Sequence, residues 1–284
     1  MDTRMSYLFL AHLLNGLLMI TMPIGLALFL SVRWKLGARL WLIGAATFIL
    51  SQIGHIPFNA LFTLVVNRTP LTEMSERSAL LFNAVYVGLS AGLFEELFRY
   101  GMFRWWVKDA RSWRKGVLTG AGHGGAEAII FGAIALYTFV QFAYLRNADL
   151  SKIVPAGQLA QTQLQVSGYW SMTWFDSLQG ALQRLFSIPT HFAMAVLVLQ
   201  TFTRRQWFWV WLAVLYHAAM DTGATLLSGL GGALPAYAFM CVFAIVNLFL
   251  VFRLRQPEPG QENLPPDRGR LNKKYLNIPF QEEL

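Results

Sequence analysis

Two adjacent carboxylates, Glu95 and Glu96, stand in an apolar stretch typical of a membrane-spanning helix, and Arg99 follows them. A charged group deep in a bilayer costs at least about 2.5 kcal/mol, so such groups are rare and mark working sites. Arg99 is one helical turn from both acids, so its guanidinium can reach either carboxylate. Pairing keeps one acid ionised, and the other is suited to act as a general base. We therefore expect Glu95, Glu96 and Arg99 to be catalytic.

Further ionisable residues occur in later apolar stretches, and four of them form pairs at a spacing of i, i+4. His123 pairs with Glu127 in this way and His217 pairs with Asp221, so each pair projects from one face of a helix. Two ligands at this spacing are typical of helical zinc sites. His191 adds an isolated imidazole in another apolar stretch. These five residues are the candidate metal ligands.

Composition indicates that these residues belong to a membrane protein. The chain has 284 residues, of which 55% are hydrophobic and only 13% charged, whereas soluble domains carry about 25% charged residues. A helix needs about 20 apolar residues to cross the hydrocarbon core, and the short alternating strands of a β-barrel do not occur. We predict an all-α polytopic bundle in a bacterial plasma membrane, in contact with membrane lipid. The seven expected spans are 7–32, 36–66, 79–107, 117–145, 174–202, 207–227 and 233–254.

The basic residues predict how the bundle is oriented. The net charge of +8 would suggest a nucleic-acid partner for a soluble protein, but here basic residues gather in the alternate connections 33–39, 104–115 and 204–205. The positive-inside rule then places the N-terminus outside and the C-terminus in the cytoplasm, and no nucleic acid is expected. The transmembrane domain, 1–255, carries the site. The polar tail, 256–284, is expected to be disordered.

Depth in the membrane indicates whether these side chains can meet. With a rise of about 1.5 Å per residue, His123 lies about 9 Å above the cytoplasmic end of its span, Glu95 about 14 Å and Asp221 about 22 Å. The other members of the set, Glu127, His191 and His217, fall between these values. Four helices thus bring polar groups to one layer nearer the cytoplasmic face. We expect them to surround one cavity that opens to the cytoplasm.

Some of these residues also have a purely structural interpretation. Glu127 could be held by Arg184 or His123 for packing, and His191 could be a core histidine. His55 precedes a proline by two residues. We interpret it as a packed histidine bonded to a carbonyl that the proline kink leaves free, and we leave it out of the site.

The motifs that carry these residues resemble a known group of membrane enzymes. In chain order they are Glu95-Glu96-x-x-Arg99, the segment 122–128 (Gly-His-Gly-Gly-Ala-Glu-Ala), His191, and His217-x-x-x-Asp221. Together they resemble the YhfC-type intramembrane metalloproteases, which stand with the CPBP and PrsW group that includes the CAAX prenyl proteases. The resemblance covers roughly residues 43–221. It implies a multi-helix membrane fold whose first motif supplies a water-activating glutamate and whose later motifs hold a metal or a polarised water.

The residues and the resemblance together predict a metal-dependent intramembrane peptidase. The ligands expected for a divalent metal, most simply zinc, are His191, His217 and Asp221, with Glu127 or a water completing the shell and His123 as a further candidate. Glu95 or Glu96 would take the proton from the attacking water, and Arg99 would orient the pair. The substrate would be a membrane protein or a lipidated peptide.

Two other classes of protein would use the same residues differently. In an ion-coupled or proton-coupled transporter the acids and histidines would form a proton relay. Many transporters are built from repeated halves, and this sequence shows no internal repeat. A non-catalytic membrane maturation partner would keep the pocket without using it. A zinc content of about one per chain, lost in His217→Ala, would favour the enzyme, because zinc sites need three or four ligands.

Overall fold

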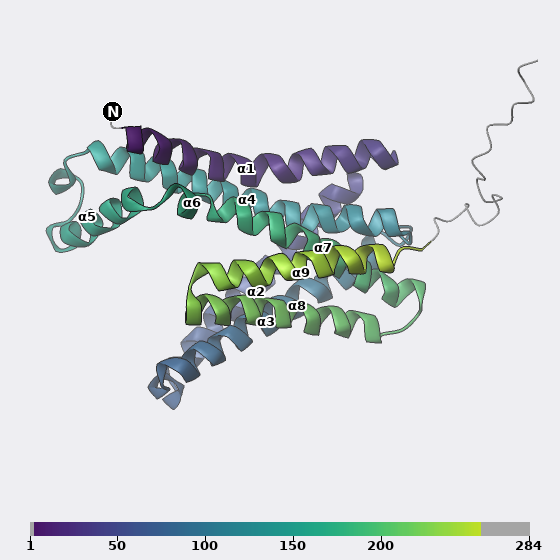
Figure 1. The fold of residues 1–284 in the computed structure, drawn as a ribbon. Coiled ribbons are helices and arrows are strands. Elements are labelled where there is room, and N and C mark those ends of the chain that lie inside the picture. The colour runs from purple at the N-terminus through teal and green to yellow at the C-terminus, as the bar shows by residue number, and fades with distance from the viewer. Residues whose placement is uncertain (1–2, 257–284) are drawn as a thin grey trace, which may run out of the picture.

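The computed structural model describes residues 3–256, and every long element among them is an α-helix (Figure 1). Seven helices are long and apolar enough to cross a membrane, which confirms the predicted all-α polytopic bundle. They are α1 (Thr3–Trp34), α2 (Arg39–Val66), α3 (Glu76–Gly101), α4 (Trp113–Asn147), α7 (Gln179–Thr203), α8 (Phe208–Gly231) and α9 (Ala233–Arg253). The predicted tail lies outside the described residues except for Gln256.

Short helices connect these spans, except that η2 continues the third span as far as Trp106. They are η1 (Pro70–Glu73), η2 (Met102–Trp106), η3 (Leu150–Lys152), α5 (Ala156–Ser171) and α6 (Trp174–Ser177). The fifth span, expected over 174–202, is therefore split at Leu178. A capping box makes α6 a separate helix, because Thr173 and Asp176 each accept the other's backbone N–H. The membrane span of this region is α7 alone.

Helix α7 forms the centre of the bundle. In its most apolar part 72% of the residues are buried, against at most 33% in the other six spans. It packs against α4 on one side and against α8 and α9 on the other. Helix α4 also runs beside α1 and α2, while α3 packs mainly on α8 (Figure 1). Residues on α4, α7 and α8 are therefore positioned to meet residues of α3 inside the bundle.

The two ends of the bundle differ in packing. We call "basic end" the end that carries the connections 35–38, 107–112 and 204–207, and "α5 end" the opposite one (Figure 1). The largest hydrophobic cluster lies in the basic half. Among its side chains, those at most 2% exposed include Met102, Phe103, Leu118, Met194, Val198 and Leu199. The centre of the basic half is thus filled by closely packed, buried apolar side chains.

Helices α2 and α4 approach closely beside Gly44. A Cβ atom added there would lie 2.0 Å from the carbonyl oxygen of Thr119, and a backbone atom cannot rotate away. We expect Gly44→Ala to lower the free energy of unfolding by about 1–3 kcal/mol, the usual cost of overpacking. Gly25→Ala is the matched control, because nothing lies within 4 Å of its added Cβ. Thermal unfolding in detergent compares the two variants, and equal midpoints would contradict the close approach.

Candidate active site

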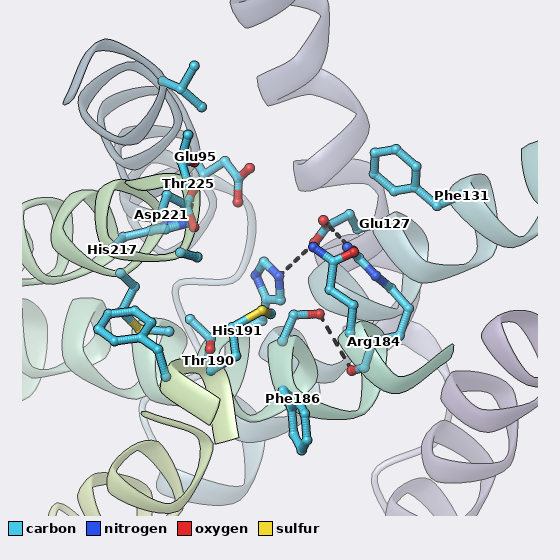
Figure 2. Close-up of a pocket in the computed structure, with 17 residues that line it drawn as sticks. Glu95, Glu127, Phe131, Arg184, Phe186, Thr190, His191, His217, Asp221 and Thr225 are labelled. Atoms are coloured by element: carbon cyan, nitrogen blue, oxygen red, sulfur yellow. Dashed lines mark hydrogen bonds and ion pairs between the residues drawn. The ribbon is translucent and has the colours of Figure 1, made fainter. Parts of the chain in front are cut away.

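Ionisable side chains from four helices meet inside the membrane-spanning part of the protein. A cavity of about 300 Å³ lies between α3, α4, α7, α8 and α9 (Figure 2). Five of the eight residues predicted for the site line it: Glu95, Glu127, His191, His217 and Asp221. The remaining three, Glu96, Arg99 and His123, do not line this cavity and are at most 1% exposed. The structure thus gathers the predicted residues in one region.

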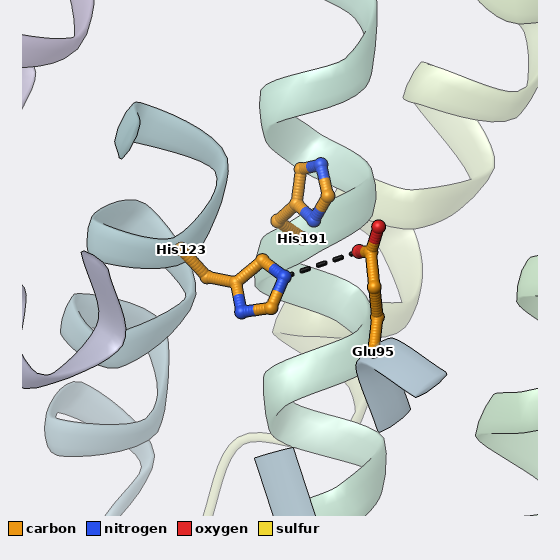
Figure 3. Close-up of side chains that lie close together, drawn as sticks. All are labelled: Glu95, His123 and His191. Carbon is orange, nitrogen blue, oxygen red and sulfur yellow. Dashed lines mark hydrogen bonds and ion pairs between the residues drawn. The ribbon is translucent and has the colours of Figure 1, made fainter. Parts of the chain in front are cut away.

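One buried group has the geometry of a metal site. Glu95, His123 and His191 each offer a ligand atom, and these atoms lie within 4.8 Å of one another (Figure 3). His123 Nε2 lies 3.1 Å from Glu95 Oε2, so the two groups share a hydrogen bond where no ion intervenes. Imidazole nitrogen and carboxylate oxygen are donors that suit zinc and neighbouring divalent ions. The residues present therefore fit a divalent metal.

Hydrogen bonds fix which nitrogen of His191 faces this group. His191 Nε2 lies 2.7 Å from Glu127 Oε2, and Nδ1 lies 3.4 Å from Nη2 of Arg99. Since a guanidinium can only donate, Nδ1 accepts from Arg99 where no ion is bound, and Nε2 donates its proton to Glu127. Arg184 also pairs with Glu127. Figure 3 shows one ring nitrogen of His191 directed toward Glu95 and His123, the arrangement of a metal-binding histidine supported by a carboxylate.

The second acid of the pair, Glu96, is held by two partners. Arg99 donates to Glu96 Oε1, and His217 Nδ1 lies 2.8 Å from the same oxygen. The opposite nitrogen, His217 Nε2, lies 3.5 Å from Asp221 Oδ2, which faces the cavity. Glu96 is therefore engaged below the cavity wall, whereas Glu95 faces the cavity itself.

The cavity extends in the direction opposite to the one expected. On α7 its lining runs from Gln183 to His191, and on α8 from His217 to Thr225, so both stretches lie between the ionisable group and the α5 end. The lining does not extend toward the basic end, the end that the basic residues predict to be cytoplasmic, so an opening to the cytoplasm stays a prediction that the lining does not support. The physical reason for this direction is the packing of the hydrophobic cluster, whose buried apolar side chains fill the centre of the basic half.

A second opening reaches the same carboxylates from the side of the bundle. Glu95 and Glu127 also line an apolar cleft of about 750 Å³ between α2 and α4. Six apolar side chains form its walls, and they are between 40% and 64% exposed: Ile49, Ile53, Ile56, Ile130, Phe131 and Ile134. Inside a membrane, apolar surface of this kind is in contact with lipid. Glu95 thus lies where a polar cavity and a lipid-facing cleft meet.

Three polar residues near the site were not placed in it from the sequence. Arg184 was expected only as a counter-ion, and it supports the carboxylate that contacts His191. Gln52 donates to Glu95 at 3.3 Å. His55 bonds to side chains, including Gln52 and Ser90, rather than to the freed carbonyl we expected. Only the i, i+3 spacing of Gln52 and His55 in an apolar helix could have indicated their contact.

Comparison with known proteins agrees with the resemblance. A family model described as YhfC intramembrane metalloprotease matches residues 18–246. A relative from Bacillus subtilis (strain 168), the "Uncharacterized membrane protein YhfC", is 26% identical over 228 residues, which cover 80% of this chain and 86% of that protein. No solved structure matches the chain. Because this family model matches most of the chain, from residue 18 to residue 246, the chain belongs to the YhfC intramembrane metalloprotease family.

Proposed function

We propose that the protein is a metal-dependent peptidase that cleaves a peptide bond of a membrane-embedded protein or lipidated peptide. The observation that supports this is the buried group of Glu95, His123 and His191, whose ligand atoms lie within 4.8 Å. Three protein ligands of this kind are typical of a catalytic zinc site. We prefer this set to the one favoured by spacing alone, because His217 is engaged by Glu96 and Asp221.

The proposed chemistry assigns separate roles to two groups of side chains. When bound, the ion would act as a Lewis acid that polarises the scissile carbonyl. His217 would transfer the proton, since Nδ1 is held by Glu96 and Nε2, at the cavity wall, lies 3.5 Å from Asp221 one turn along α8. Its Nε2 can take a proton from the attacking water and return it to the leaving amine. Arg99 holds Glu96 and thereby the ring of His217.

The test of this proposal is a search for peptide bonds whose cleavage depends on the site. Membranes from cells that carry the wild-type protein, His217→Ala or His123→Ala would be compared by N-terminal labelling and mass spectrometry. We expect new N-termini in membrane proteins that appear only with the wild type. Lys152→Met, which changes an exposed side chain, is the control and should leave them unchanged. Identical N-termini in all four samples would contradict the peptidase.

The apolar cleft is the proposed route by which the substrate reaches Glu95. Its walls are apolar and exposed to lipid, and its floor contains the carboxylate. We expect Ile53→Trp and Ile130→Trp to reduce cleavage of a membrane-spanning substrate by about tenfold or more, because misplacing a substrate by 1 Å can cost about 100-fold.

The control for these two variants is a tryptophan introduced on another lipid-facing surface. Ile245 of α9 is 65% exposed and does not line the cleft, so Ile245→Trp should cleave normally. A short water-soluble peptide that contains the same scissile bond should be cleaved equally by all three variants. Equal cleavage of the membrane-spanning substrate by Ile53→Trp and Ile245→Trp would contradict this route.

A further inference from the structure

A chain of polar side chains leads from the site along α2. Its successive members are Tyr86, Asn59, His55, Gln52 and Glu95. Each is hydrogen-bonded to the next, at 2.6, 2.9, 3.4 and 3.3 Å in that order. The first and last belong to α3, and the three between them to α2. Buried or half-buried polar groups in an apolar helix are costly unless they are paired. The four side chains that precede Glu95 belong neither to the proposed metal ligands, Glu95, His123 and His191, nor to the group around His217.

The donors of this chain all point in one direction. Since Glu95 Oε1 can only accept when ionised, Gln52 must present its amide N–H to it, and its carbonyl oxygen then accepts from His55 Nδ1. His55 Nε2 is left as an acceptor, toward the amide of Asn59 at 2.9 Å and the hydroxyl of Ser90 at 3.0 Å. The carbonyl of Asn59 in turn accepts from the hydroxyl of Tyr86. This order fixes the amide orientations and one neutral tautomer of His55.

The two oxygens of Glu95 are thereby given different partners. Oε1 faces Gln52 at 3.3 Å, and Oε2 faces His123 at 3.1 Å. A carboxylate held at one oxygen cannot rotate freely, so the other oxygen stays directed at His123 and the metal group. Aligned hydrogen bonds also polarise one another, which strengthens the last bond of the chain.

We propose that Gln52 is a positioning residue for Glu95, and that His55, Asn59 and Tyr86 hold its amide in the donating orientation. The expected effect of Gln52 on metal binding rests on the proposed function, in which Glu95 is a metal ligand. The inference itself concerns the orientation of Glu95 and applies to the protein with or without an ion.

Two measurements on purified protein test this inference. The first is the affinity for Zn²⁺, determined by competition with a chelating dye. We expect Gln52→Ala to weaken binding by about 10–100-fold, the usual effect of losing a partner that orients a metal ligand. Tyr86→Phe, at the far end of the chain, should weaken it less. Gln200→Ala is the matched control, because it removes a buried glutamine of α7 that bonds to Val196 and Arg204.

The second measurement needs no metal. An apolar carbodiimide would label carboxyl groups in metal-free protein, and mass spectrometry would give the labelling at Glu95 relative to Glu127. We expect the ratio to rise in Gln52→Ala, since the carboxyl group loses a donor and gains freedom, and to stay unchanged in Gln200→Ala.

The outcomes separate this inference from the proposed function. Wild-type protein that binds no Zn²⁺ would contradict the metal-dependent peptidase, while the labelling ratio would still decide the role of Gln52. An unchanged ratio in folded Gln52→Ala would overturn the inference, whatever the zinc affinity. If Gln52→Ala and Gln200→Ala lost the same thermal stability and had the same labelling of Glu95 relative to Glu127, Gln52 would contribute to packing alone.

Discussion

Zinc content is expected to disappear in Glu95→Gln and His123→Ala and to persist in His217→Ala, although we expect all three variants to lose the proposed peptidase activity. The first two remove ligands from the proposed group of Glu95, His123 and His191, and two remaining ligands hold zinc poorly. In our proposal His217→Ala removes only proton transfer, a loss that typically costs 10²–10⁴-fold in rate. Metal analysis of purified protein and cleavage of a membrane substrate measure the two effects separately.

The spacing of residues in the sequence favoured the reverse result. With His191, His217 and Asp221 as ligands, His217→Ala would lose the metal and Glu95→Gln would retain it. The experiment therefore chooses between two ligand sets. A graded control is Glu127→Gln, which keeps the side-chain size but weakens support of His191, and it should lower zinc affinity by about 10–100-fold. Zinc lost only in His217→Ala would contradict the ligand set that we propose.

Arg99→Met is expected to destabilise the folded protein by about 3–5 kcal/mol. Arg99 and Glu96 form an ion pair in which the side chains are only 1% and 0% exposed. Removing the guanidinium leaves a buried carboxylate without its main counter-ion, and breaking a buried pair on one side costs this amount. Chemical unfolding in mixed micelles, followed by tryptophan fluorescence, measures the change.

Two further variants show whether the lost stability comes from the unpaired charge or from packing. The double variant Glu96→Gln, Arg99→Met removes both charges, so it should recover much of the lost stability. Lys152→Met breaks an exposed pair with Asp149 whose side chains are 82% and 54% exposed, and it should change stability by at most about 1 kcal/mol. If the double variant were no more stable than Arg99→Met, the loss would come from packing and not from the unpaired charge.

The sidedness of the site has a consequence for the substrate. The cavity extends toward the α5 end, and the distribution of basic residues predicts that this end lies outside the cell. The substrate would then reach the site from the lipid or from the outer side. Thr225 lies in the α5-end part of the cavity lining, so the variant Thr225→Cys tests from which side the cavity is reached. A membrane-impermeant thiol reagent applied to whole cells should label this cysteine if the cavity is open to the outside.

The amino-acid sequence alone determined the class of fold and the set of residues that meet. Spans appear directly in the sequence because a bilayer requires about 20 apolar residues per helix, and the observed spans fall close to those expected. Charged residues inside such spans must face the protein interior. For that reason Glu95, Glu127, His191, His217 and Asp221 were all predicted, and the structure brings them to one cavity.

Only the tertiary structure decided how those residues are grouped and from where they are reached. Spacing of i, i+4 links side chains within one helix, whereas Glu95, His123 and His191 come from three helices and meet through packing. The rotation of each helix about its axis is set by contacts such as the close approach at Gly44, which no periodicity encodes. The direction of the cavity likewise follows from the filled core of the basic half, because empty space is a property of packed surfaces and not of any single helix.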